Sequence, residues 1–287
     1  MKEIVIISGK GGTGKTSVAG ALATLLPRAI LADCDVDAPD LHLLLQPYIR
    51  KRESFSGSKV ARIDESLCSA CGICRQVCRF DAITPDYRVD EMSCEGCGVC
   101  VWNCPEEAIS FLPRDSGEWY ISTTRFGEMV HARLHPGEEN SGKLVTQVRT
   151  IARDRAERQD LDFLLVDGPP GVGCPVIAAI GGADLLLVVT EPTRSAIHDM
   201  GRVLQLARHF DVPAGICVNK YDLNEEMAQE IVEFCRRENV PLLGKIAYDP
   251  QFVEAQVQGK TILELNSAAL AEFQLLIKNI LSHLAAP

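Results

Sequence analysis

A glycine-rich loop that follows a short apolar run constrains the fold of this chain more than any other feature. The run is IVII at residues 4–7, and residues 8–17 read SGKGGTGKTS. The loop fits the phosphate-binding pattern G-x-x-x-x-G-K-[ST], with Gly9, Gly14, Lys15 and Thr16 on the fixed positions. Glycines let backbone N–H groups turn toward an anion, and the following helix points its positive end at the same phosphates. The pattern therefore predicts a strand at 3–7, a nucleotide-binding loop and a helix at 15–26.

The loop pattern also assigns roles to single residues. Lys15 is expected to reach the β- and γ-phosphates, and the Thr16 hydroxyl to bind Mg²⁺. The alternative is a glycine-rich turn with an incidental lysine. The residues that we expect to contact the nucleotide here are Gly9, Gly11, Gly12, Thr13, Gly14, Lys15, Thr16 and Ser17.

A group of aspartates follows the second predicted strand, at 29–33. Strand, helix and strand in this order form a βαβ unit, which requires a parallel sheet. Asp33, Asp35 and Asp37 lie on one side if the chain stays extended. Clustered carboxylates repel one another unless a cation lies among them, so a Mg²⁺-nucleotide site explains them. The alternative is an acidic loop that caps a helix at 39–46.

Further strands end in polar residues of the same kind. An apolar strand at 161–166 ends at Asp167, the position from which a Walker B carboxylate holds the Mg²⁺ water shell. Strands are also expected at 184–190, at 215–218 before Asn219, and at 242–246 before Asp249. This alternation predicts an α/β fold with a mostly parallel sheet, typical of P-loop NTPases.

Lys10, inside the loop, has no role in the basic pattern. With this lysine the loop resembles that of the deviant Walker A ATPases, the superfamily of MinD, ParA, the nitrogenase iron protein and the Mrp iron–sulfur carriers. The resemblance implies a slow or partner-stimulated ATPase that binds ATP or ADP with Mg²⁺. It also implies a nucleotide-dependent homodimer in which Lys10 touches the nucleotide of the other subunit.

The same resemblance implies further site residues. Asp35 would orient the attacking water, so the catalytic set becomes Lys10, Lys15 and Asp35, with Asp33 and Asp37 as support on the Mg²⁺ side. Asn219 would contact the purine base, and Asp249 would form the other side of the base pocket. Residues 219–222 also match the N-K-x-D string of GTPases, so adenine over guanine rests on the loop lysine alone.

Eight of the twelve cysteines fall in two runs with the same spacing, C-x2-C-x2-C-x3-C, offset by 26 residues. Ligand-type spacing favours metal clusters over disulfides. Two such runs are the pattern of bacterial two-cluster ferredoxins, in which the fourth cysteine of each run binds the other cluster. One [4Fe–4S] cluster would take Cys68, Cys71, Cys74 and Cys104, and the other Cys94, Cys97, Cys100 and Cys78. Zinc or structural thiols are the alternatives.

These runs predict an inserted, small α+β ferredoxin-like domain at 60–112. The insertion interrupts an ATPase domain at 1–47 and 117–287, and residues 50–58 are expected to form a polar linker to it. A short hairpin at 118–134 is expected to rejoin the main sheet. Cys174 is either a partly exposed thiol or a small packed side chain, and packing is favoured for Cys34, Cys217 and Cys235.

The composition excludes some partners. A formal charge of −10 argues against nucleic acid, which is held by lysine and arginine clusters. No apolar run reaches the roughly 18 residues that a membrane span needs, so we expect a cytoplasmic protein for which membrane contact is unlikely. The last helix, at 267–284, is expected to pack on the sheet, with lipid binding as the alternative.

Three functions remain open on the sequence. The leading interpretation is an ATPase that couples nucleotide state to electron transfer through the two clusters to a partner. The alternatives are an Mrp-like iron–sulfur carrier or assembly ATPase and a MinD-like positioning ATPase. The redox partner or iron–sulfur client is not identified by the sequence.

Overall fold

The chain forms two compact units in the computed structural model, which describes residues 1–138, 141–265 and 267–285. The sheet unit comprises residues 1–52, 119–133 and 141–287, and the cysteine unit comprises residues 53–118 and 134–140. The cysteine unit therefore includes more of the chain than the predicted insertion at 60–112, because a return segment at 134–140 also belongs to it.

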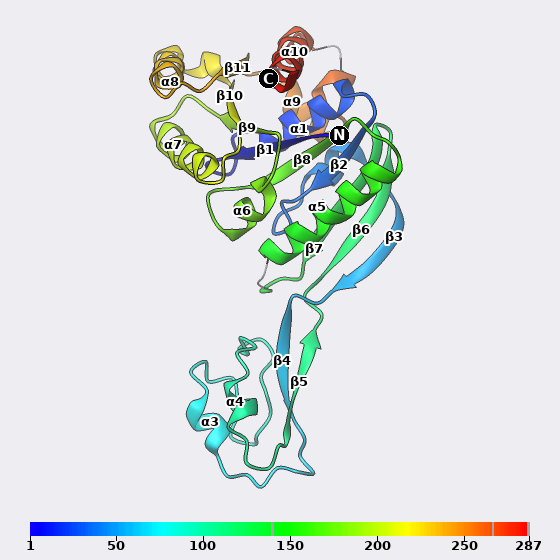
Figure 1. The fold of residues 1–287 in the computed structure, drawn as a ribbon, viewed down its shortest axis with the longest axis vertical. Helices are drawn as coiled ribbons and strands as arrows, with labels where there is room; N and C mark the ends of the chain where they lie inside the picture. The colour runs from blue at the N-terminus through cyan, green and yellow to red at the C-terminus, as the bar shows by residue number, and fades with distance from the viewer. Residues whose placement is uncertain (139–140, 266, 286–287) are drawn as a thin grey trace. The chain divides into compact units, whose positions relative to one another are not determined.

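The sheet unit is built on one nine-stranded sheet with the order β11-β10-β9-β1-β8-β2-β7-β6-β3 (Figure 1). The neighbours of β1, β2 and β10 along the sheet pair with them in parallel register, as the sequence predicts. The strands are β1 (Lys2–Ser8), β2 (Ala29–Asp33), β3 (Tyr48–Phe55), β6 (Gly117–Thr124), β7 (Gly127–Leu134), β8 (Phe163–Pro170), β9 (Leu185–Thr190), β10 (Ala214–Asn219) and β11 (Leu242–Ile246).

Helices cover both faces of this sheet, because the central strands are apolar along most of their length and alternate residues point to opposite faces. Ile4 and Ile6 join the core that packs under α1 (Lys15–Leu25) and α10 (Ala269–Ala285). On the other face lie α5 (Ser141–Arg158), α6 (Cys174–Ile180) and α7 (Arg194–His209). The remaining helical segments are α2 (Leu41–Leu45), α8 (Glu225–Arg237), α9 (Gln251–Val257) and two short 3₁₀ turns, η1 (Tyr221–Leu223) and η2 (Ile262–Glu264).

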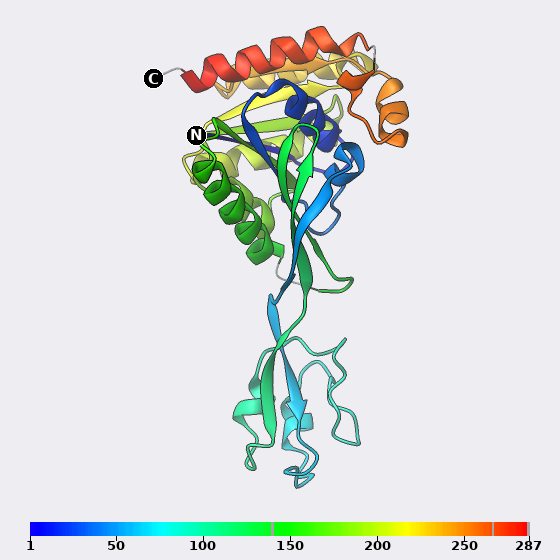
Figure 2. The same cartoon turned by 90° about the vertical axis from the view of Figure 1, so that its right-hand side faces the viewer.

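The C-terminal helix α10, red in Figure 2, packs on β11 through Phe273, Leu276 and Ile280, which are fully buried. Packing on the sheet is thus confirmed for these residues. Across the residues that the structure describes, no helix has both the length and the apolar character that a membrane crossing needs.

The polar linker predicted at 50–58 is wrong. Residues 48–55 form β3, the edge strand of the sheet, and β4 (Ser58–Ile63) begins three residues later. All residues of β3 before Phe55 are exposed, so this strand carries charged side chains and shows no apolar alternation. Charged edge strands protect a sheet from pairing with other chains, and they are hard to recognise in a sequence for the same reason. The predicted hairpin at 118–134 is confirmed as β6 and β7.

The cysteine unit contains an antiparallel ribbon of β4 and β5 (Ile109–Arg114), with the short helices α3 (Ile73–Val77) and α4 (Val99–Trp102) beside it (Figure 2). Its backbone repeats at the 26-residue offset of the cysteine runs. Left-handed residues occur in three matched pairs: Ala70 with Gly96, Gly72 with Gly98, and Asp81 with Glu107. The sequence repeat is therefore also a repeat of backbone conformation.

Candidate functional site

A large cavity of about 680 Å³ lies at the carboxyl ends of the parallel strands of the sheet unit. Open α/β sheets bind ligands at this edge. From the glycine-rich loop the cavity is lined by Gly11, Gly12, Gly14, Lys15, Thr16 and Ser17. The loops after β2, β10 and β11 add Asp35, Asp37, Lys220, Tyr248 and Asp249, and the lining also includes Asn219 at the end of β10 and Phe252 in α9.

Two glycines of the loop are required by close packing. Gly14 has φ +88°, and a Cβ there would lie 2.3 Å from Nδ2 of Asn219. A Cβ on Gly9 would lie 2.5 Å from Cβ of Asp199 in α7, so Gly9 lets this helix approach the loop. Gly9 does not line the cavity, and neither does Thr13, whose carbonyl instead accepts a hydrogen bond from Asn219 Nδ2 at 2.8 Å.

Lys15 is buried among carboxylates at the floor of the cavity. Its Nζ lies 2.8 Å from Oδ1 of Asp167 and 3.5 Å from Oδ2 of Asp35. Burial alone would lower the pKa of Lys15, but the charges of Asp167 and Asp35 outweigh it and raise that pKa. Lys15 is therefore charged, and the structure brings together three residues that the sequence assigned to one site.

The residues around Lys15 fit a magnesium ion. The second carboxylate oxygen of Asp167, Oδ2, is buried and has no hydrogen-bond partner among the described residues. Thr16 Oγ1 lies 3.3 Å from Lys15 Nζ and so belongs to the same group of polar atoms. A buried carboxylate oxygen without a partner is costly, and a hydrated hard cation would satisfy it. Thr16 and Asp167 are the residues that would hold it.

Asp33 supports the loop after β2 and does not line the cavity. Its Oδ1 accepts a hydrogen bond from the backbone N–H of Asp35, and its Oδ2 from that of Leu41. Burial, followed by the charge of Asp167, raises the pKa of Asp33 well above its usual range. Burial also raises the pKa values of Asp35 and Asp37, both of which line the cavity. Of the three aspartates, Asp33 is thus the one that stabilises the conformation of this loop through hydrogen bonds from its backbone.

Asn219 and Asp249, the two predicted base contacts, both line the cavity. Asn219 also ties β10 to the glycine-rich loop, because its amide donates to Thr13 as described. The carboxylate of Asp249 accepts hydrogen bonds from Gln251 N–H and from Ser267 Oγ, both at 2.8 Å, and thereby fixes the start of α9. Contact of either residue with a base stays a prediction.

Lys10, the additional loop lysine, is absent from the cavity lining. Its Nζ lies 2.9 Å from Oε1 of Glu191, the residue after β9. Glu191 and the second lysine that it binds, Lys220, were missed as site residues by the sequence analysis. A carboxylate at the end of the strand next to β1 is the signal that could have found Glu191.

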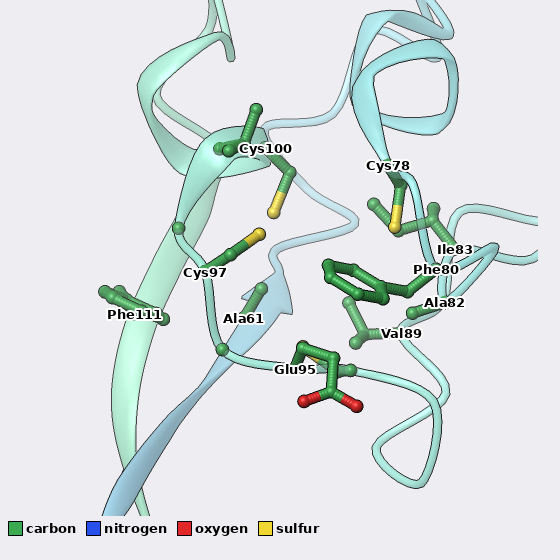
Figure 3. A pocket seen from close by; sticks show the side chains of 14 residues that line it. Ala61, Cys78, Phe80, Ala82, Ile83, Val89, Glu95, Cys97, Cys100 and Phe111 are labelled. Atoms are coloured by element: carbon green, nitrogen blue, oxygen red, sulfur yellow. The ribbon is translucent and has the colours of Figure 1, made fainter.

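The eight clustered cysteines line two separate cavities of the cysteine unit. One cavity is lined by Cys68, Cys71, Cys74 and Cys104, and the other by Cys78, Cys94, Cys97 and Cys100. These sets match the interleaved assignment made from the spacing. Figure 3 shows the sulfur atoms of Cys78, Cys97 and Cys100 turned toward the same space, with the ring of Phe80 beside them.

The donor set of each cavity, four thiols, fits a [4Fe–4S] cluster. Within the described residues, no group of three or more His, Cys, Asp or Glu side chains could hold a single metal ion. Each thiolate of a four-iron cluster binds a different iron, so its sulfur atoms need not converge on one point. Apolar side chains complete the cavity walls, including Ile83, Val89 and Phe111 in one and Ile63 and Ile109 in the other.

The other cysteines have different surroundings. Cys34, Cys217 and Cys235 are buried, as expected of small packed side chains, and burial raises the pKa of all three thiols. Cys174 is exposed, so the packed alternative for this residue is wrong. It begins α6, where the backbone of Gly142 lies close to it.

Comparisons with known proteins agree with this fold. A family model described as the CobQ/CobB/MinD/ParA nucleotide binding domain matches residues 4–262. An uncharacterized protein of Methanocaldococcus jannaschii is 36% identical over 225 residues, which cover 77% of this chain and 79% of that protein. An iron–sulfur cluster carrier protein of Pyrococcus horikoshii is 23% identical over 91% of this chain and 79% of its own length.

Among solved structures, the septum site-determining protein MinD of Pyrococcus horikoshii, complexed with Mg-ADP, superimposes with a TM-score of 0.59. The alignment covers 97% of this chain and 95% of that one at 19% identity. The likeness shows the α/β fold of the sheet unit. The names of these relatives agree better with the carrier and MinD-like alternatives than with electron transfer.

Proposed function

The chain belongs to the CobQ/CobB/MinD/ParA nucleotide-binding family, and we propose that it is an ATPase whose nucleotide state controls iron–sulfur clusters held by the cysteine unit. Two observations carry the proposal together: eight cysteines sort into two cavities of four, and the same chain has a nucleotide-type cavity in its sheet unit. The clusters, when bound, would supply one-electron redox chemistry or serve as cargo.

In the proposed ATPase reaction, water attacks the γ-phosphate in line with the leaving oxygen. Lys15 neutralises charge on the phosphates, for which it must exchange its contacts with Asp167 and Asp35. Asp35 then orients the water, and Thr16 and Asp167 would hold Mg²⁺, which would neutralise phosphate charge when bound. Lys15, Thr16 and Asp35 already line the cavity, and Asp167 contacts Lys15, so small rearrangements suffice.

Two uses of the clusters have separate support. A carrier or assembly role is supported by the cluster carrier among the relatives. Electron transfer is supported by the interleaving, since release of either cluster would require cysteines of both runs to let go. MinD-like positioning has the fold in its favour but gives the eight cysteines no role.

The deciding experiment uses protein purified without oxygen. We expect about eight iron atoms per chain, four in each cluster, and ATP hydrolysis that Lys15→Ala abolishes. Redox titration with and without Mg-ATP then separates the two uses. A shift of cluster potential without iron loss supports electron transfer. ATP-dependent transfer of iron to an apo-acceptor at unchanged potential supports the carrier. Protein that binds no iron on reconstitution would refute both.

A further inference from the structure

Glu191 holds two lysines of the nucleotide site with one carboxylate. Its Oε1 lies 2.9 Å from Lys10 Nζ, and its Oε2 lies 3.3 Å from Lys220 Nζ. Burial opposes ionisation of this carboxyl, but hydrogen bonds from both lysines hold its pKa below the usual value. Glu191 is therefore an ionised bridge between the glycine-rich loop and the segment after β10.

Lys10 has no donor left for a phosphate in this arrangement. A lysine ammonium group has three N–H donors. In Lys10 they meet Glu191 Oε1 at 2.9 Å, Ser195 Oγ at 3.1 Å and Thr193 Oγ1 at 3.3 Å. All three acceptors lie between the end of β9 and the first turn of α7 in the same chain. Lys10 is thus fully bound within its own subunit.

Lys220 connects the same carboxylate to the tip of the loop. Its Nζ donates to the carbonyl of Gly12 at 3.1 Å as well as to Glu191. Gly12 has φ +80°, a conformation that glycine adopts at little cost. The loop tip is therefore held by Lys220 in the shape that lines the cavity, whether or not Lys10 stays in place.

We propose that Glu191 is a positioning residue that stores Lys10 in its own subunit and thereby sets the ATP concentration at which the homodimer forms. The inference rests on the proposed ATPase dimer, in which Lys10 must reach the partner's nucleotide. Before it can do so, Lys10 must exchange three contacts, and this cost lowers the population of the competent conformation. A substitution that weakens the contacts of Lys10 within its own subunit should therefore raise the apparent affinity of the two subunits for each other.

The test is an ATP titration of the full chain with Mg²⁺, in which the dimer fraction is measured by light scattering. Glu191→Gln keeps the size of the side chain and removes its charge. We expect half-maximal dimer at about 3- to 10-fold lower ATP, the effect of losing one partly exposed ion pair. Affinity of the monomer for ADP should not change, because Glu191 does not line the cavity.

Two further variants make the result specific. Ser195→Ala removes one neutral acceptor of Lys10 and should shift the ATP midpoint in the same direction by less. Glu238→Gln is the matched control, because this carboxylate is also partly buried and pairs with a cation, Arg208, at 2.9 Å. It should leave the midpoint unchanged.

The outcomes separate the inference from the function on which it rests. An unchanged or higher ATP midpoint in Glu191→Gln overturns the storage role, even if the wild type dimerises. If the wild type and Lys10→Ala dimerise equally well, or neither does, then the proposed dimer itself fails and the storage role fails with it. Should Glu191→Gln not fold, the Ser195→Ala midpoint decides alone.

Discussion

The sheet unit buries aliphatic side chains on both faces of its central strands, whereas the core cluster of the cysteine unit has only four buried residues. These are Ala61, Cys74, Ile83 and Ile109. The side chains packed against them include Cys78, Cys94, Cys100 and Cys104, so the cavity-lining thiols themselves make up much of this core. Small domains with few apolar contacts usually need disulfides or metals for stability. The sheet unit can therefore form its site without a ligand, while the folding of the cysteine unit depends on what fills its cavities.

Iron removal should unfold the cysteine unit and leave the sheet unit folded. Chelation of anaerobically purified protein is expected to abolish hydrogen-exchange protection at residues 53–118, because metal binding free energy is folding free energy in such units. The thermal transition of the sheet unit should remain. Cys97→Ser should act in the same direction, and Cys174→Ser, a change at another exposed cysteine, should not. Protection that survives chelation would show that the thiols pack well enough alone.

Removal of a buried ion pair tests how strongly the stability of the sheet unit depends on its interior contacts. Arg149 Nε donates to Glu3 Oε1 at 2.7 Å, and both side chains are less than a tenth exposed. Glu3→Gln should lower the free energy of unfolding by about 3–5 kcal/mol, because it leaves the buried guanidinium of Arg149 without a carboxylate partner. Urea unfolding measures it. Arg88→Gln, in an ion pair of the cysteine unit that is about 70% exposed, should change little, and an equal loss there would contradict the contrast.

The next largest effect is expected on nucleotide affinity, from a substitution in the glycine-rich loop. Gly14→Ala forces an alanine to φ +88° against Asn219, which costs about 1–3 kcal/mol. We expect about 10- to 100-fold weaker ADP binding in a calorimetric titration. Gly201→Ala in α7 is the control, because a Cβ there meets only Phe234 at an ordinary 3.7 Å and Gly201 does not line the cavity. Equal losses in the two variants would mean that the loop is not held ready by Asn219.

The smallest effect is a pH dependence within the sheet unit. Burial, together with the nearby His42, lowers the pKa of His131 from 6.5 to about 4. As pH falls below 6.5 the unfolded chain takes up a proton that the folded chain refuses until about pH 4, so stability is lost across this window. The loss for this residue is about 0.7 kcal/mol between pH 7 and pH 6. Urea midpoints of the wild type should fall by more than those of His131→Gln, and parallel curves would exclude His131 as the cause.

The sequence predicts features that depend on local pattern. The glycine-rich loop, the apolar strands and the two cysteine runs each require fixed residue types at fixed spacing. The structure has the loop between β1 and α1 and the cysteines around two cavities, as the sequence predicts. The edge strand β3 was not predicted because its exposed residues show no periodic pattern of apolar side chains. Glu191 escaped because its partners, Lys10 and Lys220, are far away in the chain and meet it only when β9 lies beside β1 and β10. The position of Glu191 after a predicted strand is visible in the sequence, but its contacts with the two lysines are not.

The interleaving of the two cysteine runs has a consequence for biosynthesis. Each cavity takes three cysteines from one run and the fourth from the other. A nascent chain that has left the ribosome only as far as Cys78 therefore offers neither cavity a complete set of ligands. Cys104 must emerge before the first cavity closes, and by then all ligands of the second are present. The proposed clusters could therefore load into neither cavity before Cys100 has emerged, and a chain truncated between the two runs would hold none.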